Sequence, residues 1–357
     1  MRVVFLIEDS LPNGAVGPEL TPTLWSLIEQ GGWAPGGGTS VLASSTYPNH
    51  ATFATGTDVQ DHRIFTNRIH DGDRFVCSST IGPVGETLFA AARAAGRTTS
   101  VVLGDNTMIG SMGAGEADVS WPPSNGPRDD VATDCLGYPA NEVVIEQIDE
   151  LEALSADLAI VHMNDPDSTL HLHGPDAAEA ASRIRAVDDD LAAVVERIRP
   201  AWDDTVLFVV SDHEQEAIDP DLEPVRFADE LATAGLPGAA HDEGMAGIVY
   251  GGPGADRLRS LSAISGALDL DVAEGISLVW SEPGRVFGGG HKTFRGQHGS
   301  PRTTTQVAAV AGGHPAVRAI ARSLATRQPH ASDWAPTMAA LLGIPLPAAT
   351  GTPLVAI

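Results

Sequence analysis

The chain has 357 residues, 43% of them hydrophobic, so it can bury a large core as one large or two ordinary globular domains. Its 47 acidic and 21 basic residues give a formal charge of −26 at pH 7, which disfavours nucleic-acid polymers and anionic membranes as partners. No apolar run approaches the roughly 20 residues that cross a bilayer. Met1 leads directly into RVVFLIED without room for a signal peptide, so we expect a cytoplasmic protein. Two cysteines, Cys77 and Cys135, are too few for a disulfide framework, and we expect both to be structural.

Short apolar, β-branched runs alternate along the chain with longer stretches of helical periodicity. In chain order, strand-like runs occupy 2–7, 98–103, 158–163 and 205–211, and helix-like segments occupy 21–30, 85–96, 141–154 and 177–198. Runs that are apolar on both faces and interleaved with helices predict an α/β fold with a mostly parallel central sheet and helices on both faces. In such folds ligands bind beyond the carboxyl ends of the strands.

Two segments interrupt this alternation. Residues 104–140 are rich in glycine and proline, and because loops longer than about 15 residues are usually functional or disordered, we expect a lid or pocket wall there. Residues 219–290 predict a small inserted α+β excursion before the main sheet resumes. The chain closes with a helix in DWAPTMAALLGIPLP, ended by Gly343 and Pro345. We expect a single domain over residues 1–357, with 219–290 as a subdomain.

Three predicted strands are each followed by an aspartate at the same edge of the sheet. These are Asp9, Asp167 and Asp212. Asp167 and His171 are four residues apart, which places them on one face of a helical turn at a spacing suited to one cation. Asp212 and His213 are adjacent, so both can meet one ion only in a loop at a strand end, where they lie. Taken singly, each residue is more often a turn, capping or surface group, so the prediction depends on the combination.

The segment SSTYPNH adds a hydroxyl, Thr46, and RGQHGS adds His298 before the next apolar run. Mixed carboxylate and imidazole ligands suit Zn²⁺, with Mn²⁺ as a possible substitute. Two zinc ions roughly 4 Å apart can clamp a phosphoryl group, activating a nucleophilic hydroxyl and stabilising the leaving oxygen. We therefore predict Thr46 as the nucleophile, placed before a helix whose backbone N–H groups face the substrate anion.

These motifs resemble those of the alkaline phosphatase superfamily, and within it the nucleotide pyrophosphatase/phosphodiesterase (type I phosphodiesterase) branch. TYPNH resembles the T-F-P-N-H nucleophile motif, DHRIFTN the H-G-I-x-x-N run, and DPDSTLHLHGP the E-P-D-x-x-G-H-x-x-G-P segment. The resemblance implies an alkaline-phosphatase-like fold over nearly the whole chain. It also implies that Thr46 is the nucleophile and that Asn67 donates a hydrogen bond to a phosphoryl oxygen.

The resemblance further implies two zinc ions with separate ligand sets. One set is Asp167, His171 and His298, and the other is Asp9, Asp212, His213 and Thr46. The implied activity is hydrolysis of phosphodiester or nucleotide pyrophosphate bonds in a small phosphorylated substrate, through a phospho-threonine intermediate. The sequence indicates no particular oligomeric state.

The chain departs from the family pattern at two positions near the predicted ligands. Ser10 and Glu214 each stand where the family usually has glycine. We expect Glu214 either to support the zinc site or to point to solvent. His291 competes with His298 for the third histidine role, and we expect His298 because it precedes a glycine and the next strand.

The residues around the nucleophile indicate which phosphate ester is cut. Enzymes that prefer phosphomonoesters usually bind the extra anionic oxygen with the guanidinium group of an arginine. Asn67 is a neutral donor, so we expect the substrate to be a phosphodiester. Arg63 and Arg68 flank Asn67 and are expected to be exposed, as is Lys292. The alternatives are a phosphonoacetate-hydrolase-like enzyme that cleaves C–P bonds, a phosphomonoesterase, or a metal-dependent binding protein without catalysis.

Several other residues close to these motifs have expected supporting roles. His50 and His62 match helix-start and turn positions, and His162 lies inside a predicted strand. Tyr47, beside the nucleophile, either stacks on a ring of the substrate or shapes the loop.

Overall fold

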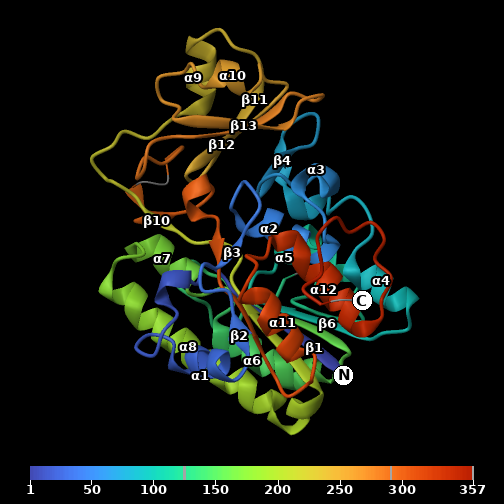
Figure 1. The fold of residues 1–357 in the computed structure, drawn as a ribbon. Coiled ribbons are helices and arrows are strands. Elements are labelled where there is room, and N and C mark those ends of the chain that lie inside the picture. The colour runs from blue at the N-terminus through green and yellow to red at the C-terminus, as the bar shows by residue number, and fades with distance from the viewer. Residues whose placement is uncertain (124–125, 290–291, 356–357) are drawn as a thin grey trace.

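A seven-stranded sheet forms the centre of the main body in this computed structural model, which describes residues 1–123, 126–289 and 292–355 (Figure 1). In spatial order the strands are β2 (Gly32–Trp33), β17 (Ala308–Ala311), β9 (Thr205–Val210), β1 (Arg2–Glu8), β8 (Leu158–Met163), β6 (Thr99–Leu103) and β7 (Val119–Trp121). Strands β9, β1, β8, β6 and β7 run parallel, and β17 is antiparallel to both of its neighbours. The predicted mostly parallel sheet is confirmed.

Both faces of the sheet are buried, as the apolar strand runs require. In β1, Val3, Phe5 and Ile7 pack into one core cluster and Val4 and Leu6 into another on the opposite face, because successive side chains of a strand point to opposite sides. The helices that pack in the first cluster include α2 (Thr46–Thr55), α4 (Leu88–Ala94), α5 (Met108–Ser111), α11 (Val317–Leu324) and α12 (Trp334–Leu342). Those in the second are α1 (Pro22–Gln30), α6 (Asn141–Glu150) and α8 (Ala178–Ile198). Helices therefore cover both faces, as predicted.

The glycine- and proline-rich segment 104–140 is only partly the loop that its composition predicts. Val119–Trp121 pairs with β6 as the parallel edge strand β7, so the segment contributes to the main sheet. A three-residue run with a serine at its centre is too short for its pattern to reveal a strand, which is held by pairing with β6 and by the burial of Trp121 in the second core cluster. The later part of the segment does form a pocket wall, described below.

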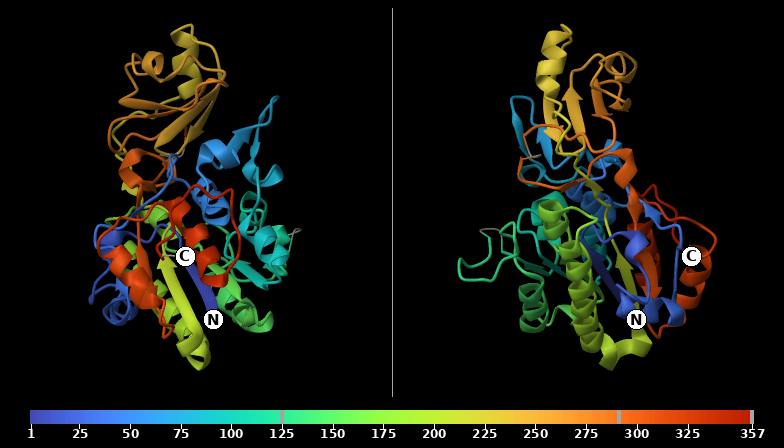
Figure 2. Two further views of the ribbon diagram at one scale, coloured as in Figure 1. Left: turned by 45° about the vertical axis from the view of Figure 1, so that its right-hand side comes forward. Right: turned by 90° about the vertical axis from the view of Figure 1, so that its left-hand side faces the viewer.

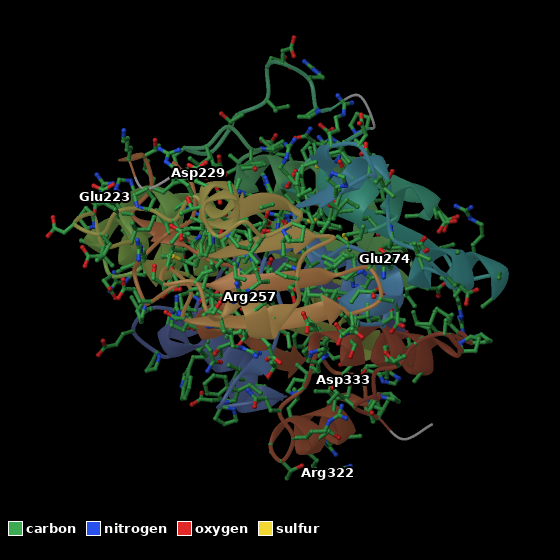
Figure 3. All side chains as sticks on the ribbon, turned by 90° about the horizontal axis from the view of Figure 1, so that it is seen from above. Glu223, Asp229, Arg257, Glu274, Arg322 and Asp333 are labelled. Atoms are coloured by element: carbon green, nitrogen blue, oxygen red, sulfur yellow. The ribbon has the colours of Figure 1, made fainter. Side chains whose placement is uncertain are left out.

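A second, four-stranded antiparallel sheet lies above the main body in Figures 1 and 2, within the interrupting segment 219–290. Its spatial order is β11 (Ala239–Glu243), β12 (Ala246–Tyr250), β14 (Ile276–Trp280) and β13 (Gly266–Asp271). The helices α9 (Phe227–Thr233) and α10 (Ala255–Leu258) complete a separate small core with it. The other face of this sheet packs in the first core cluster through Ile248 and Leu278, and Arg63 of the main body pairs with Asp271 and Glu274, each at 2.5 Å. Seen from above, Glu274 lies at one side of the sheet (Figure 3).

Short strand pairs and helices connect these parts and position the site. The pairs are β3 (Gly38–Thr39) with β16 (Thr305–Gln306), β4 (Arg68–His70) with β5 (Phe75–Cys77), and β10 (Glu216–Ala217) with β15 (Gly296–Gln297). The remaining α-helices of the described chain are α3 (Val59–His62) and α7 (Asp167–His173). None of the described helices is both long enough and apolar enough to cross a lipid bilayer.

Candidate active site and metal centre

The three strand-end aspartates meet at one edge of the main sheet. Asp9 follows β1 directly, Asp212 stands two residues after β9, and Asp167 opens α7 just beyond β8. The neighbouring strands are parallel, so their carboxyl ends lie together, and all three side chains are buried. The structure therefore places them as the sequence predicts.

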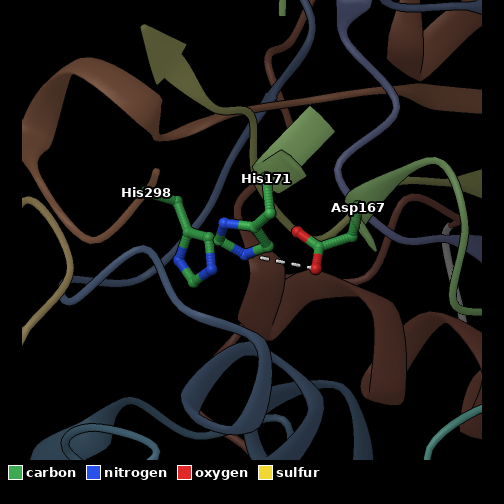
Figure 4. Close-up of side chains that lie close together, drawn as sticks. All are labelled: Asp167, His171 and His298. Carbon is green, nitrogen blue, oxygen red and sulfur yellow. Dashed lines mark ion pairs between the residues drawn. The ribbon is translucent and has the colours of Figure 1, made fainter. Parts of the chain in front are cut away.

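Two groups of buried side chains at this edge could each hold a metal ion, because within each group the ligand atoms lie within 4.8 Å of one another. The first group is Asp167, His171 and His298, and the second is Asp9, Asp212 and His213. Figure 4 shows Asp167 and His171 beside each other on α7, with His298 reaching them from the chain that follows β15. The structure thus brings all six residues together in the same two sets that the family resemblance implies, while His291 lies outside the described residues.

The two histidines of the first group are oriented by backbone carbonyls. Nδ1 of His171 lies 3.0 Å from the carbonyl oxygen of Gly296, and Nδ1 of His298 lies 3.1 Å from that of Ser44. A carbonyl oxygen only accepts hydrogen bonds, so each Nδ1 carries a hydrogen and Nε2 is the ring nitrogen left to bind a cation. Such support for the far ring nitrogen is usual in metal-binding histidines.

Two buried carboxylate oxygens of the second group have no hydrogen-bond partner. Oδ2 of Asp9 lies 2.9 Å from Nε2 of His162, but its Oδ1 is unpartnered. Oδ1 of Asp212 accepts the backbone N–H groups of Ser10 at 3.1 Å and His213 at 2.9 Å, but its Oδ2 is unpartnered. Burying a charged oxygen without a partner is costly. A divalent cation would satisfy both atoms, so the residues fit a metal ion.

The titration of these groups reflects the same crowding of charge. Burial, with the neighbouring charge of Asp212, raises the pKa of Asp9 well above its usual range, and burial raises the pKa of Asp212 to about 6. Burial would also raise the pKa of Asp167, but the charge of His171 outweighs it and holds that pKa below its usual range. Ionising both carboxyls of the second group is therefore unfavourable, and a bound cation would offset this cost.

Thr46 is the first residue of α2, whereas the sequence places it before the helix. Its hydroxyl oxygen lies 3.3 Å from Nε2 of His213. The same ring nitrogen lies 3.3 Å from Oδ2 of Asp212. The helix offers fewer free donors than expected, because the N–H of Tyr47 bonds to Oδ1 of Asn67 at 3.0 Å and Pro48 has no N–H. Thr46 itself thus reaches the second ligand group.

Asn67 lines the cavity and is held by two hydrogen bonds. Its Oδ1 accepts from Tyr47, and its own backbone N–H donates to Oε1 of Glu243 at 2.8 Å. Because the oxygen is occupied, the NH₂ group is the part left to meet a substrate. Glu243 is a residue that the sequence analysis missed: it is buried at the end of β11, in the second sheet, and burial raises its pKa to about 7. Nothing in the local pattern links it to a residue 176 positions away.

A cavity of about 150 Å³ opens beside the first ligand group. It is lined by Thr46, Tyr47, Asn67, Asp105, Leu136, Tyr138, Asn164, Asp167, His171, Phe294, Gln297 and His298. Among these lining residues of the described chain there is no lysine or arginine. Leu136 and Tyr138 belong to the 104–140 segment, which therefore supplies a pocket wall, as predicted.

Tyr47 is fixed beside Thr46 by its hydroxyl. The hydroxyl donates to Oδ2 of Asp105 at 2.8 Å and contacts Thr107. Of the two predicted roles, the structure supports shaping of the loop, while the ring also lines the cavity.

Other residues singled out in the sequence lie away from the ligand atoms. Glu214 neither touches a ligand nor points to solvent, because its Oε1 accepts the backbone N–H of Asn13 at 2.8 Å. Arg63 faces the second sheet, and exposed Arg68 donates to the carbonyl of Phe75 at 3.2 Å. Lys292 is exposed.

The histidines near the motif divide as expected between supporting and structural roles. His50 is buried with its Nδ1 2.7 Å from the carbonyl oxygen of Thr46, and His62 lies with its Nε2 2.9 Å from the hydroxyl of Thr52. Neither belongs to a ligand group.

Comparison with known proteins places this site in a family. Residues 3–268 match the family model described as type I phosphodiesterase / nucleotide pyrophosphatase. A comparison of the sequence with curated proteins found no match. Among solved structures, human ectonucleotide pyrophosphatase/phosphodiesterase 5 has 15% identity and a TM-score of 0.73, covering 97% of this chain and 96% of its own. The murine protein has 15% identity and a TM-score of 0.74, with 99% and 98% coverage.

A further structure of the murine protein is an inactive threonine-to-alanine variant in complex with AMP, again at 15% identity and a TM-score of 0.74, with 99% and 97% coverage. At 15% identity, the similarity to these structures shows that the chain has the alkaline-phosphatase-like fold. The family model, which matches residues 3–268, shows the family. This chain therefore belongs to the type I phosphodiesterase/nucleotide pyrophosphatase family, a family of metal-dependent phosphoric ester hydrolases.

Proposed function

We propose that this protein cleaves phosphodiester or nucleotide pyrophosphate bonds, using Thr46 as a nucleophile and two metal ions. The observation that carries the proposal is the convergence of the Thr46 hydroxyl, Nε2 of His213 and two unpartnered carboxylate oxygens on one side of the His213 ring. Such a buried donor set, next to a hydroxyl, is suited to a metal-activated nucleophile.

Two zinc ions would occupy the two ligand groups, with Mn²⁺ a possible substitute, and would lower the pKa of the attacking hydroxyl and stabilise the leaving oxygen. Thr46 Oγ1 would give up its proton to solvent and attack phosphorus, so that a bond to Thr46 forms as the bond to the leaving alcohol or phosphate breaks and the leaving oxygen takes a proton from solvent. Water then cleaves this phospho-threonine ester and restores the hydroxyl. The amide nitrogen of Asn67 would donate to a non-bridging oxygen of the phosphoryl group throughout.

The lining of the cavity supports a diester as the substrate. A monoester carries a second negative charge, which a guanidinium fork would stabilise, but the described lining contains no arginine or lysine and Asn67 is a neutral donor. The rings of Tyr47 and Phe294 and the side chain of Leu136 offer apolar surface for the esterified organic group. The AMP complex of the murine neighbour supports a nucleotide as one such group.

A substrate panel on the zinc-loaded protein tests this preference. We expect kcat/KM for a phosphodiester or a nucleoside pyrophosphate to exceed that for the matching monoester by about tenfold or more, since a neutral donor forgoes roughly 1 to 1.5 kcal/mol relative to a charged one. Arg68→Ala should leave this ratio unchanged, because Arg68 is exposed outside the cavity. Faster cleavage of the monoester, or of a phosphonate, would contradict the proposed substrate class.

A further inference from the structure

Ser10 occupies an unusual backbone position between the two ligand groups. Its side chain is fully buried, and its φ angle of 59° lies in the left-handed region that favours glycine. The family pattern has glycine here, which suits that angle. A serine at a position better suited to glycine indicates that its hydroxyl has a use.

The hydroxyl of Ser10 contacts one residue from each ligand group. Its Oγ lies 2.7 Å from Oδ1 of Asp167, in the first group, and 3.0 Å from Nδ1 of His213, in the second. Its backbone N–H also donates to Oδ1 of Asp212 at 3.1 Å. Ser10 thus bridges the two groups without being in either of them.

Counting hydrogens fixes the direction of these bonds. A serine hydroxyl has one hydrogen, and an ionised carboxylate can only accept, so the hydrogen of Ser10 goes to Asp167. Towards His213 the hydroxyl must then accept, which requires the hydrogen of that ring to be on Nδ1. Nε2 of His213 is left with its lone pair, directed at Asp9 Oδ1, 3.8 Å away, and Asp212 Oδ2, 3.3 Å away.

The same bond also selects the free oxygen of Asp167. Oδ1 accepts from Ser10 and, at 2.6 Å, from Nε2 of Gln215, whereas Oδ2 lies 3.3 Å from Nε2 of His171, on the side of the first ligand group. The Ser10 hydroxyl and the Gln215 amide therefore together leave Oδ2 of Asp167 available to bind, and the same hydroxyl leaves Nε2 of His213 available.

We propose that Ser10 is a positioning residue that couples the two metal sites of this protein. It holds the Asp167 carboxylate and the His213 ring in their binding arrangements through a single hydroxyl, so its loss weakens both sites together. The inference rests on the proposed function to the extent that both groups hold a metal ion.

The test is an equilibrium zinc titration of the full chain against a competing chelator, comparing wild type with Ser10→Ala. We expect the dissociation constants of both sites to rise by about 10- to 100-fold, the usual effect of removing a group that orients metal ligands. The cobalt-loaded protein gives a second readout, because its visible spectrum reports ligand geometry and should change in the variant.

Two further variants separate the hydroxyl from general effects on folding. Ser10→Gly also lacks the hydroxyl but suits the φ angle, so it should fold and show the same loss of affinity at both sites. Ser100→Ala removes a buried hydroxyl that bonds to the carbonyl of Ala153 at 2.6 Å, and should leave both dissociation constants unchanged.

The outcomes distinguish this inference from the proposed function. If wild type binds two ions but Ser10→Gly weakens neither site, or only one, the coupling role of Ser10 is wrong and the two-metal proposal stands. If wild type itself binds fewer than two ions under saturating zinc, both are wrong.

Discussion

Thr46→Ala should lower kcat by at least about 10³-fold while leaving zinc binding largely intact. The variant lacks the hydroxyl that forms the covalent intermediate, and a water molecule in its place would have no fixed position. The variant also loses Thr46 as an expected ligand of the second set, but the six candidate aspartate and histidine ligands remain, so the metal content should stay close to that of wild type. Steady-state kinetics with a diester, together with metal analysis, measure both quantities.

Thr46→Ser is the matched control for this substitution. It keeps a hydroxyl at the first position of α2 and loses only a methyl group, so it should retain far more activity than the alanine variant. Near-normal turnover of Thr46→Ala with an unchanged metal content would show that Thr46 is not the nucleophile.

Removal of the metal ions should abolish hydrolysis and lower the melting temperature by roughly 10 °C. When the free concentration of zinc is about 1,000 times the dissociation constant of each site, the two bound ions together add about 8 kcal/mol to the free energy of unfolding. For a chain of 357 residues this corresponds to a shift in melting temperature of about that size. The structural reason is that Asp9 Oδ1 and Asp212 Oδ2 are buried without another partner. Calorimetry before and after treatment with a chelator measures the change.

Readdition of metal provides the control for this experiment. Zinc should restore both the melting temperature and the activity, whereas magnesium should restore neither fully, because imidazole ligands suit zinc better than magnesium. An unchanged melting temperature after complete removal of metal would contradict the assignment of these buried groups as ligands.

The parts of the site that the sequence could predict are those with a local signal. Asp9, Asp167 and Asp212 each follow an apolar strand, and topology alone then brings parallel strand ends to one edge. His171 follows from helical spacing and His213 from adjacency to Asp212. The same reasoning predicts the central sheet and the helices that cover it.

Residues that act through long-range contacts had no such signal. Glu243 holds the backbone of Asn67 from the second sheet, and Tyr47 is fixed by Asp105 from another loop. Glu214 is adjacent in sequence to His213, a predicted ligand, yet its side chain turns to Asn13, because a half-buried carboxylate is stabilised by a backbone N–H. The orientation of a side chain depends on tertiary packing, and the position of the residue in the sequence does not reveal it.

The most direct test of the account is mass spectrometry of enzyme that has been quenched in acid during turnover of a phosphodiester. The account predicts that the peptide containing Thr46 gains the mass of the phosphoryl group with its remaining ester, and that this adduct is absent from Thr46→Ala. Turnover without any adduct on Thr46, under conditions in which breakdown of the intermediate limits the rate, would contradict it.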